Sequence, residues 1–365
     1  MAFPYLNIDL NKIEANARAI VDLCSRHGIE VTGVTKVACG HPEVARAMLR
    51  GGVSSIADSR LENIHRLKKA GVETRYMLLR VPPLSGVEQV VESVSVSLNS
   101  ELAVLEALSK EALKRGRVHD VIVMVDLGDL REGVWPDDLL PLVREALKLD
   151  GIRITGLGTN LACFSGVLPD KEKMNALVEL ANDVERTFQL ELAHVSGLNS
   201  SGLELIAEGS VPERVNHARI GEAILLGRET ARRTPWPGTD QDAFTLYAEV
   251  LEMKAKPSRP VGARGEDAFG ERPRFEDRGV RNRALLNVGR EDVVLGGVAP
   301  LDSSMQVIGA SSGYLAVDVT DVAGGVRVGD ELGFSVNYGA LLRVMTSEYV
   351  KKRIFRKGVC VDTGL

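Results

Sequence analysis

Lys36 is the residue whose type and position most directly suggest chemistry. It follows the apolar, β-branched run at residues 31–35, and the turn VACGHP comes after it. The run predicts a buried strand, and HPEVARAMLRGG predicts a helix that ends at glycine. Lys36 would therefore lie at the carboxyl end of a parallel strand, where α/β folds place reactive groups, and a Schiff-base lysine is one interpretation. An ordinary lysine in a strand-to-helix loop is the other, and the spacing alone favours it.

Two turns rich in small residues could bind a phosphate. In SGLNSSGLEL, Asn199 and Ser200 precede a helical run, so the Ser200 hydroxyl and backbone N–H groups can point at an anion. In RIGEAILLG, the backbone at Gly221 can approach a ligand closely, and Glu222 begins the next helical run. Either turn alone is a common feature of loops. Together with a lysine at another strand end, they would suit a phosphorylated aldehyde cofactor.

The elements that must position these residues alternate along the chain. Amphipathic stretches such as SRLENIHRLKKAG and DDLLPLVREALKLDG have apolar residues at helical spacing and a terminal glycine. Between such stretches lie eight runs that predict strands, at residues 31–35, 54–57, 75–79, 94–98, 120–125, 152–157, 192–195 and 215–219. An eightfold strand–helix repeat favours a closed (β/α)8 TIM barrel, whose strand ends share one rim. We therefore expect an α/β barrel domain over residues 1–235.

The sequence changes character after Gly227. RETARRTPWPGTDQ has no periodicity and predicts a connection between domains. Beyond it, the runs FTLYAEVLEMKAKP, RALLNVG, MQVIGASS, YLAVDVTD, VGDELGFSVNYGALL and YVKKRIF alternate or are apolar, with turn residues between them. We expect a C-terminal all-β domain, a barrel or sandwich, over residues 236–365. The YLNIDL run within residues 1–10 predicts a strand before the barrel and is a candidate to pair with that distant domain.

Composition narrows the class of protein. The 365 residues are 44% hydrophobic and 26% charged, with a net charge of -5, which argues against nucleic acid and against an anionic membrane as partners. No run approaches the length of a membrane span, and no signal peptide is visible, so we expect a cytoplasmic protein. The four cysteines and six histidines show no metal-ligand spacing, so we expect reduced thiols and no metal.

The order of motifs resembles a known family. YLNIDLNKIEANA, VTGVTKVACG, ADSRLENI, MVDLGDLREG, GTNLACFSG, SGLNSSGL, NHARIGEAILLGRET, PGTDQDAF, FEDRGVRNRALLNVGRED, GASS and VNYGALLRVMTS follow one another over nearly the whole chain. In this order they resemble the fold-type III pyridoxal-phosphate enzymes, the alanine racemase family, and most closely its ornithine racemase branch. The resemblance raises the Schiff-base interpretation of Lys36 above the alternative.

The resemblance implies a role for each matching residue. Lys36 would carry pyridoxal 5'-phosphate and act as acid and base on one face of the substrate Cα. Arg219 would face the pyridine nitrogen and keep it unprotonated, so that the ring is a weaker electron sink. The phosphate would be held by Ser200, the backbone amides of Gly221 and Glu222, and Tyr338. Arg131 would support the phenolic oxygen and the substrate carboxylate. Asn160 matches a histidine that packs near the ring in alanine racemases.

The sequence departs from the alanine racemase pattern at two places. Met124 stands where many of these enzymes have a carbamylated lysine that supports the arginine. Phe269, in the DAFG segment, aligns with the tyrosine that the partner subunit contributes as the base on the opposite face. A phenyl ring cannot transfer a proton, so another group must do so. Asp267 and Tyr314 are the candidates, although a loop carboxylate and a surface strand residue are the plainer interpretations.

The resemblance implies racemisation of an amino acid by removal and return of the Cα proton, in a head-to-tail homodimer with shared active sites. In the ornithine branch, the distal ammonium of the substrate needs an acidic partner, for which Asp58, Asp129, Glu132 and Asp267 are candidates. Alanine or a broad set of amino acids are alternative substrates. A fold-type III aldolase or dehydratase, which would want a metal site, and a non-enzymatic pyridoxal-phosphate homeostasis protein are alternatives of a different class.

Overall fold

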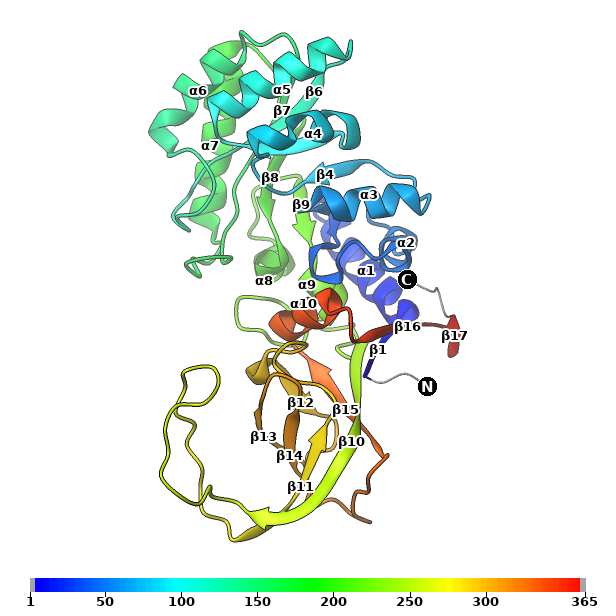
Figure 1. Cartoon of the computed structure of the whole chain (residues 1–365). Helices are drawn as coiled ribbons and strands as arrows, with labels where there is room; N and C mark the ends of the chain where they lie inside the picture. The colour runs from blue at the N-terminus through cyan, green and yellow to red at the C-terminus, as the bar shows by residue number, and fades with distance from the viewer. Residues whose placement is uncertain (1–3, 362–365) are drawn as a thin grey trace. The chain divides into compact units, whose positions relative to one another are not determined.

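The computed structural model describes residues 4–361, which form two compact units (Figure 1). One unit is the continuous segment Leu10–Gln241. The other combines the chain up to Asp9 with the chain from Asp242 onward. None of the helices in the described part of the chain is long and apolar enough to cross a membrane.

The first unit is a closed barrel of eight parallel strands, each bonded to the next and the last bonded to the first. The strands are β2 Glu30–Val34, β3 Ser55–Asp58, β4 Tyr76–Leu78, β5 Val96–Asn99, β6 His119–Met124, β7 Ile152–Gly158, β8 His194–Leu198 and β9 His217–Ile220. All eight predicted strands are present, displaced by no more than two residues at most ends. The (β/α)8 barrel expected from the strand–helix repeat is confirmed.

Helices follow the strands and lie outside them (Figure 1). They are α1 Leu10–Ser25, α2 Pro42–Arg50, α3 Leu61–Lys69, α4 Val87–Ser93, α5 Leu102–Lys114, α6 Leu139–Ala146, α7 Lys171–Phe188, α8 Leu203–Ala207 and α9 Glu222–Leu226. The longest, α7, begins where Asp170 accepts a hydrogen bond from the Lys173 backbone N–H. Such a cap satisfies one of the free donors at a helix start. Apolar residues at helical spacing bury one side of α7 against the barrel.

Part of the barrel is filled by an apolar cluster contributed by five neighbouring strands, β2 to β6. Its buried members are Val34, Ala57, Met77, Val96, Leu98, Ile122 and Met124. Met124 is fully buried and contributes a thioether that fills space between strands. The position that carries a lysine in many alanine racemases is therefore part of the barrel core in this chain.

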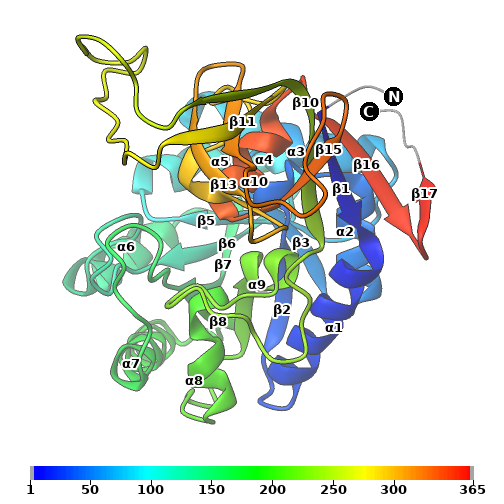
Figure 2. The same cartoon turned by 90° about the horizontal axis from the view of Figure 1, so that it is seen from below.

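The second unit is built on a nine-stranded sheet. Its main path runs β13-β14-β11-β10-β1-β16-β17, and β15 pairs with β10 and with β12. The bounds are β1 Tyr5–Asp9, β10 Phe244–Pro257, β11 Val280–Leu286, β12 Val298–Pro300, β13 Gln306–Ala310, β14 Leu315–Asp318, β15 Glu331–Val336, β16 Lys351–Arg356 and β17 Val359–Val361. Strand β1 lies between β10, to which it is antiparallel, and β16, to which it is parallel (Figure 2).

The expectation that this unit is entirely β structure is wrong for one segment. The run VNYGALL, predicted as strand, breaks after Val336, and α10 Tyr338–Thr346 follows. Asn337 causes the change, because its side chain accepts a hydrogen bond from the Ala340 backbone N–H and so caps the helix. Good helix formers follow, and Leu341 and Val344 bury the inner face.

Candidate active site

Lys36 lies directly after β2, in the short 3-10 turn Lys36–Ala38, and is half-buried. The preceding residue fixes this turn, because Thr35 Oγ1 donates to Asp58 Oδ2 at 2.8 Å and ties β2 to β3. The charge on Lys36 also acts on Glu222, which begins α9 after β9. Burial raises the pKa of Glu222, while Arg233 and Lys36 act in the opposite direction. The barrel therefore brings together a lysine and a carboxyl group that are far apart in sequence.

Arg219 is buried on β9, two residues before the phosphate-binding turn expected at Gly221. Its Nη1 donates to Ser196 O at 2.9 Å and to Ser196 Oγ, and its Nη2 donates to Thr159 O at 2.6 Å. No carboxylate forms an ion pair with it among residues 4–361. Burial lowers the pKa of Arg219 to about 10, which still leaves the guanidinium charged at neutral pH. The barrel interior thus holds a cation whose protein acceptors are neutral oxygens.

Ser200 and Gly221 meet at the carboxyl ends of β8 and β9. Ser200 is buried, and its Oγ accepts from the Ala223 backbone N–H at 3.1 Å. The Ser200 side chain makes no other hydrogen bond in the described chain, so its O–H can donate to a ligand. A Cβ atom at Gly221 would lie 3.0 Å from Val34 O and Val34 Cβ, so only glycine allows the end of β9 to approach β2 this closely.

The end of β7 offers polar atoms that the protein leaves unsatisfied. Thr159 Oγ1 and Asn160 Nδ2 are buried and have no hydrogen-bond partner among residues 4–361. Asn199 is already committed, because its Oδ1 accepts from the Ser201 backbone N–H at 2.8 Å and its Nδ2 donates to Leu161 O at 2.8 Å. Buried polar groups are normally paired, so the two free atoms are what a polar ligand at this end of β7 would satisfy.

Arg131 lies in a loop after β6 that folds back on the strand. Val134 N donates to Met124 O, and Asp126 N donates to Val134 O, both at 2.9 Å. Gly133 permits this closure, because its φ is +136° and a Cβ there would lie 2.5 Å from Asp126 N. The Arg131 guanidinium is partly exposed and pairs with the neighbouring Glu132, with Nη2 2.6 Å from Oε1.

The same loop is linked electrostatically to the buried arginine. Glu132 and Cys163 act to raise the pKa of Arg219, and Arg131 acts to lower it, although all three effects are smaller than that of burial. Residues that follow β6 and β7 are therefore close enough to influence Arg219 on β9. The barrel brings together the predicted site residues Lys36, Arg131, Asn160, Asn199, Ser200, Arg219, Gly221 and Glu222 at the carboxyl ends of its strands.

Two of the carboxylates considered for the substrate ammonium already serve the scaffold. Asp129 is buried, and its two oxygens accept four backbone N–H bonds from residues 163–167. Asp58 is also buried and accepts from Thr35 Oγ1 and Asn63 Nδ2. Carboxylates engaged in this way have little capacity left for a substrate. Glu132 is the remaining candidate within the barrel, since it is partly exposed at the rim.

The other predicted site residues belong to the second unit. Tyr338 is the first residue of α10. Asp267 caps a turn, because its Oδ1 accepts from the backbone N–H groups of Phe269 and Glu271 at 2.9 Å. These donors lower the pKa of Asp267. The Phe269 ring stacks under the Arg290 guanidinium, 4.3 Å from ring centroid to carbon. Tyr314 lies in the turn between β13 and β14 and is half exposed.

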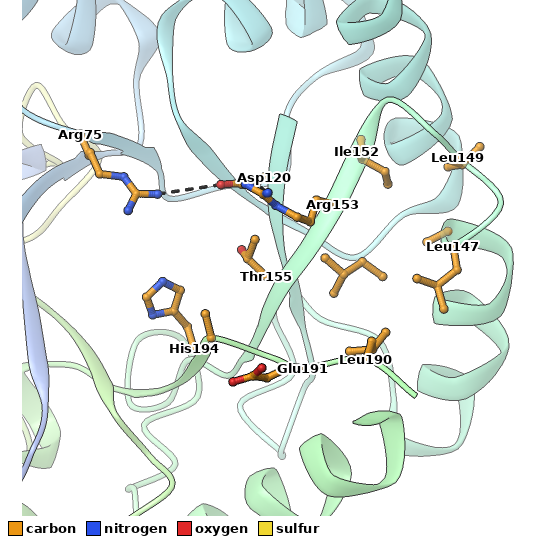
Figure 3. A pocket seen from close by; sticks show the side chains of 13 residues that line it. Arg75, Asp120, Leu147, Leu149, Ile152, Arg153, Thr155, Leu190, Glu191 and His194 are labelled. Carbon is orange, nitrogen blue, oxygen red and sulfur yellow. Dashed lines mark hydrogen bonds and ion pairs between the residues drawn. The ribbon is translucent and has the colours of Figure 1, made fainter. Parts of the chain in front are cut away.

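A cavity of about 540 Å³ lies at the opposite end of the barrel (Figure 3). Asp120 and Arg153 line it from the amino ends of β6 and β7, with Arg153 Nε donating to Asp120 Oδ1 at 2.8 Å. An Arg75 guanidinium nitrogen lies 3.9 Å from the same carboxylate, and His194 forms another wall. In barrels of this type the amino ends of the strands serve stability, and reacting groups follow the carboxyl ends. We therefore place the candidate active site at the Lys36 end.

Sequence reasoning did not single out Thr32 and His217, two polar side chains inside the barrel below Arg219. His217 lies two residues before Arg219 on β9, on the same face of the strand, and hydrogen bonds with Ser196 and Thr32. The sequence signal that could have found them is the alternation along a strand, in which every second side chain faces the barrel interior. Thr32, Ser196 and His217 interrupt otherwise apolar strands at positions that face inward.

The fold and the site together define a class of protein, a (β/α)8 barrel with a lysine, a buried arginine and a serine at one rim, followed by a mainly antiparallel β domain. The alanine racemase N-terminal domain family matches residues 8–229. Ornithine racemase of Acetoanaerobium sticklandii is 42% identical over 96% of this chain and 99% of its own length. Lysine racemase of Thermotoga maritima is 40% identical over 96% and 98%.

This chain belongs to the alanine racemase family, and its resemblance to the ornithine racemase branch is confirmed. Among solved structures, alanine racemase of Bartonella henselae with covalently bound pyridoxal phosphate superposes with a TM-score of 0.74. The superposition covers 97% of this chain and 100% of the other, at 20% sequence identity. At that identity the match establishes the fold.

Proposed function

We propose that this protein is a pyridoxal-phosphate-dependent racemase of basic amino acids, ornithine or lysine. Two relatives that align with this chain over almost their full lengths, at 42% and 40% identity, are named ornithine racemase and lysine racemase. The observation that carries the proposal is the meeting of Lys36, buried Arg219 and Ser200 at one end of the barrel. The second unit, of more than a hundred residues, argues against a non-enzymatic homeostasis protein, the alternative of a different class that the resemblance had left open.

The residues at the rim fit pyridoxal phosphate. Lys36 would hold its aldehyde carbon, and Ser200 O–H with the Gly221 and Glu222 backbone would hold its phosphate. The unsatisfied Asn160 Nδ2 supplies one further donor. When bound, the cofactor would delocalise the electron pair that remains on the substrate Cα after the proton leaves. Tyr338 of the second unit is proposed as an additional phosphate ligand.

Arg219 would set the electronic character of the site. Its guanidinium has donors only, and its protein contacts are two carbonyl oxygens and a hydroxyl. No carboxylate from the described chain shares its charge, so a ring nitrogen facing it would meet a full cation and stay unprotonated. That arrangement limits the lifetime of the carbanion and favours simple return of the proton.

Lys36 would hold and move the proton at the substrate Cα on one face. On the other face we propose Asp267 or Tyr314 of the partner subunit as the second acid and base. Asp267 is held in a turn by backbone donors that stabilise its charged form, which weakens it as a base. Separate mutation of the two residues, with rates measured from the L and the D enantiomer, tests both, and undiminished rates in both directions would discard them.

A head-to-tail homodimer is part of the proposal, because the second base comes from a partner. Exposed apolar residues on the loops after β6 and β7 support it, namely Leu130, Trp135, Phe164 and Leu168. Clusters of exposed apolar residues mark protein contacts. We also propose a cytoplasmic location, which is supported by the finding that no two of the four cysteines form a disulfide in the described part of the chain.

The proposed preference for basic amino acids depends on a carboxylate at the barrel rim that can still bind the distal ammonium of the substrate. Asp58 and Asp129 are engaged with the scaffold, so we propose Glu132 as the partner of the distal ammonium inside the barrel. Glu132 now pairs with Arg131, and a substrate could compete for it by offering its own carboxylate to Arg131 and its ammonium to Glu132. Glu132→Gln should therefore weaken ornithine turnover more than alanine turnover, because only ornithine offers a distal ammonium to the Glu132 carboxylate.

The first experiment is proton NMR of L-ornithine, L-lysine, L-arginine, L-alanine and L-serine in D₂O with the cofactor-loaded protein, followed by chiral chromatography. Loss of the α-proton signal with formation of the D enantiomer of a basic amino acid is the expected result. Exchange without inversion would mean that a single base works. No exchange with any of the five would overturn the proposed racemase.

Borohydride reduction of the loaded protein and mass spectrometry test the role of Lys36. The adduct should map to Lys36 and be absent from Lys36→Ala. The matched control is Lys148→Ala, because Lys148 is an exposed lysine paired with Glu145 on the outside of the barrel. An adduct on another lysine in Lys36→Ala would exclude Lys36 as the attachment site.

A further inference from the structure

A line of hydrogen-bonded side chains crosses the interior of the barrel below Arg219. Ser196 Oγ receives a bond from Arg219 and lies 2.6 Å from His217 Nδ1. On the other side of the ring, His217 Nε2 lies 2.8 Å from Thr32 Oγ1, which lies 2.7 Å from Ser55 Oγ. We call Ser55, Thr32, His217 and Ser196 the inner relay. It ends at a cavity of about 40 Å³ lined by Thr32, Ser55, His194 and His217.

The chemistry of the groups fixes the direction of these bonds. A guanidinium can only donate, so Ser196 Oγ accepts from Arg219. If Ser196 then donates its own proton to His217 Nδ1, the imidazole carries its hydrogen on Nε2 and donates to Thr32. The opposite tautomer would donate from Nδ1 to Ser196 and leave the Ser196 hydroxyl proton without an acceptor in a fully buried place. Such a group is costly, so the first arrangement is favoured.

The surroundings of His217 keep its imidazole neutral. The ring is buried, and burial holds its pKa well below the usual value, with the charge of Arg219 and the nearby His194 ring acting in the same direction. The two imidazole rings are 5.2 Å apart between centroids. Nδ1 of a neutral ring with hydrogen on Nε2 is an acceptor, as the inner relay requires.

We propose that His217 is a positioning residue for Arg219. By accepting the Ser196 hydroxyl proton, it turns the Ser196 oxygen toward the guanidinium and selects the side-chain conformation that presents the other N–H groups of Arg219 to the cofactor ring. Through this contact a buried histidine nearer the amino ends of the strands fixes the orientation of Arg219. The inference rests on the proposed function, since it assumes that the cofactor ring nitrogen faces Arg219.

Two variants of His217 separate positioning from simple loss of packing. His217→Asn keeps an acceptor near the place of Nδ1, whereas His217→Leu fills similar space without one. His217→Leu should weaken binding of pyridoxal phosphate about tenfold and shift the absorption maximum of the bound cofactor, and His217→Asn should restore much of both. Ser196→Ala should resemble His217→Leu, and the double variant should be no worse than either single one, because both remove the same relay.

The matched control is His119→Leu. His119 is as buried as His217, at 2% exposed, and its Nε2 bonds to Ser97 Oγ at 2.8 Å, but this pair does not lead to Arg219. The control should lose stability while keeping the dissociation constant and spectrum of the cofactor. If His119→Leu changed the dissociation constant and the absorption maximum of the cofactor as much as His217→Leu does, the inference would be overturned. It would also be overturned if His217→Leu changed neither of them.

Nitrogen-15 NMR of histidine-labelled full-length protein gives a direct readout. His217 should show a protonated Nε2 and a bare Nδ1 that do not change between pH 6 and pH 8. A protonated Nδ1 would contradict the relay. Failure to racemise any amino acid would overturn the proposed function, whereas the tautomer and the dissociation constants decide the role of His217 without any turnover.

Discussion

The buried carboxylate of Asp129 should stabilise the loops after β6 and β7 by several kcal/mol. It accepts backbone N–H bonds from Cys163 at 3.2 Å and Phe164 at 2.9 Å on one oxygen. The other oxygen accepts from Ser165 at 3.0 Å and Val167 at 3.3 Å. A single side chain after β6 thus holds the loop after β7. We choose Asp129→Asn as the perturbation, because asparagine keeps the shape and removes the charge.

The magnitude follows from the geometry. The amide oxygen of asparagine can keep the two bonds on one side, while its NH₂ group would face two N–H donors on the other. Two charge-assisted bonds are therefore lost, each worth about 1.5–3 kcal/mol. Because the loop can relax toward solvent and recover part of this, we expect a loss of about 3 kcal/mol in the free energy of unfolding.

Urea unfolding followed by circular dichroism measures the loss, and hydrogen exchange of the amides in residues 163–167 locates it. The matched control is Asp138→Asn, the same change at an exposed carboxylate of the same region, which should cost less than about 0.5 kcal/mol. A cost below about 1 kcal/mol for Asp129→Asn, or unchanged exchange at residues 163–167, would refute the view that this carboxylate clamps the two loops.

Three further predictions concern single residues. Gly133→Ala should destabilise the protein by more than Gly128→Ala, since both have positive φ but only a Cβ at 133 meets Asp126 N, and urea midpoints measured side by side would show it. Burial lowers the pKa of His119 to about 4, so the folded state loses stability as pH falls from about 6.5 toward 4. Between pH 7.5 and pH 5, the free energy of unfolding of His119→Gln should therefore fall by about 2 kcal/mol less than that of the wild type, as measured by urea unfolding. An identical fall in both proteins would contradict the lowered pKa of His119. Ser200→Ala should raise the dissociation constant of pyridoxal phosphate about tenfold without changing the melting temperature of the protein without cofactor, and equal affinity would remove Ser200 from the phosphate site.

The regular part of the fold could be predicted because local patterns dictate it. Each barrel strand is a short apolar run, and the chemistry at strand ends follows from the barrel itself, so Lys36 and Ser200 could be placed on one rim before any coordinates. The helix at Tyr338 was missed because ALLRVM is apolar enough to extend the preceding strand. What decides against strand is a single cap, the bond from Ala340 N to Asn337 Oδ1.

The candidate site was harder to predict where long-range partners decide the role of a residue. Asp129 looked like a free loop acid, yet its partners begin 34 residues further along the chain. The same holds for His217, whose hydrogen-bond partners Ser196 and Thr32 come from two other strands. Residue type gives the chemistry that a side chain can do, and only the closed barrel shows which of its atoms are already engaged.

Strand β1 has a consequence for how the molecule is made. It pairs with β10, where Tyr5 is opposite Tyr247, and with β16, where Ile8 is opposite Ile354. A ribosome adds about 5–20 residues per second, so β1 waits about 10–50 s for its first neighbour, and the barrel segment can be complete before then. Until β16 emerges, the backbone donors and acceptors on one edge of β1 remain open to other chains. Crowding of nascent chains is therefore the condition under which this fold is most exposed to misassembly.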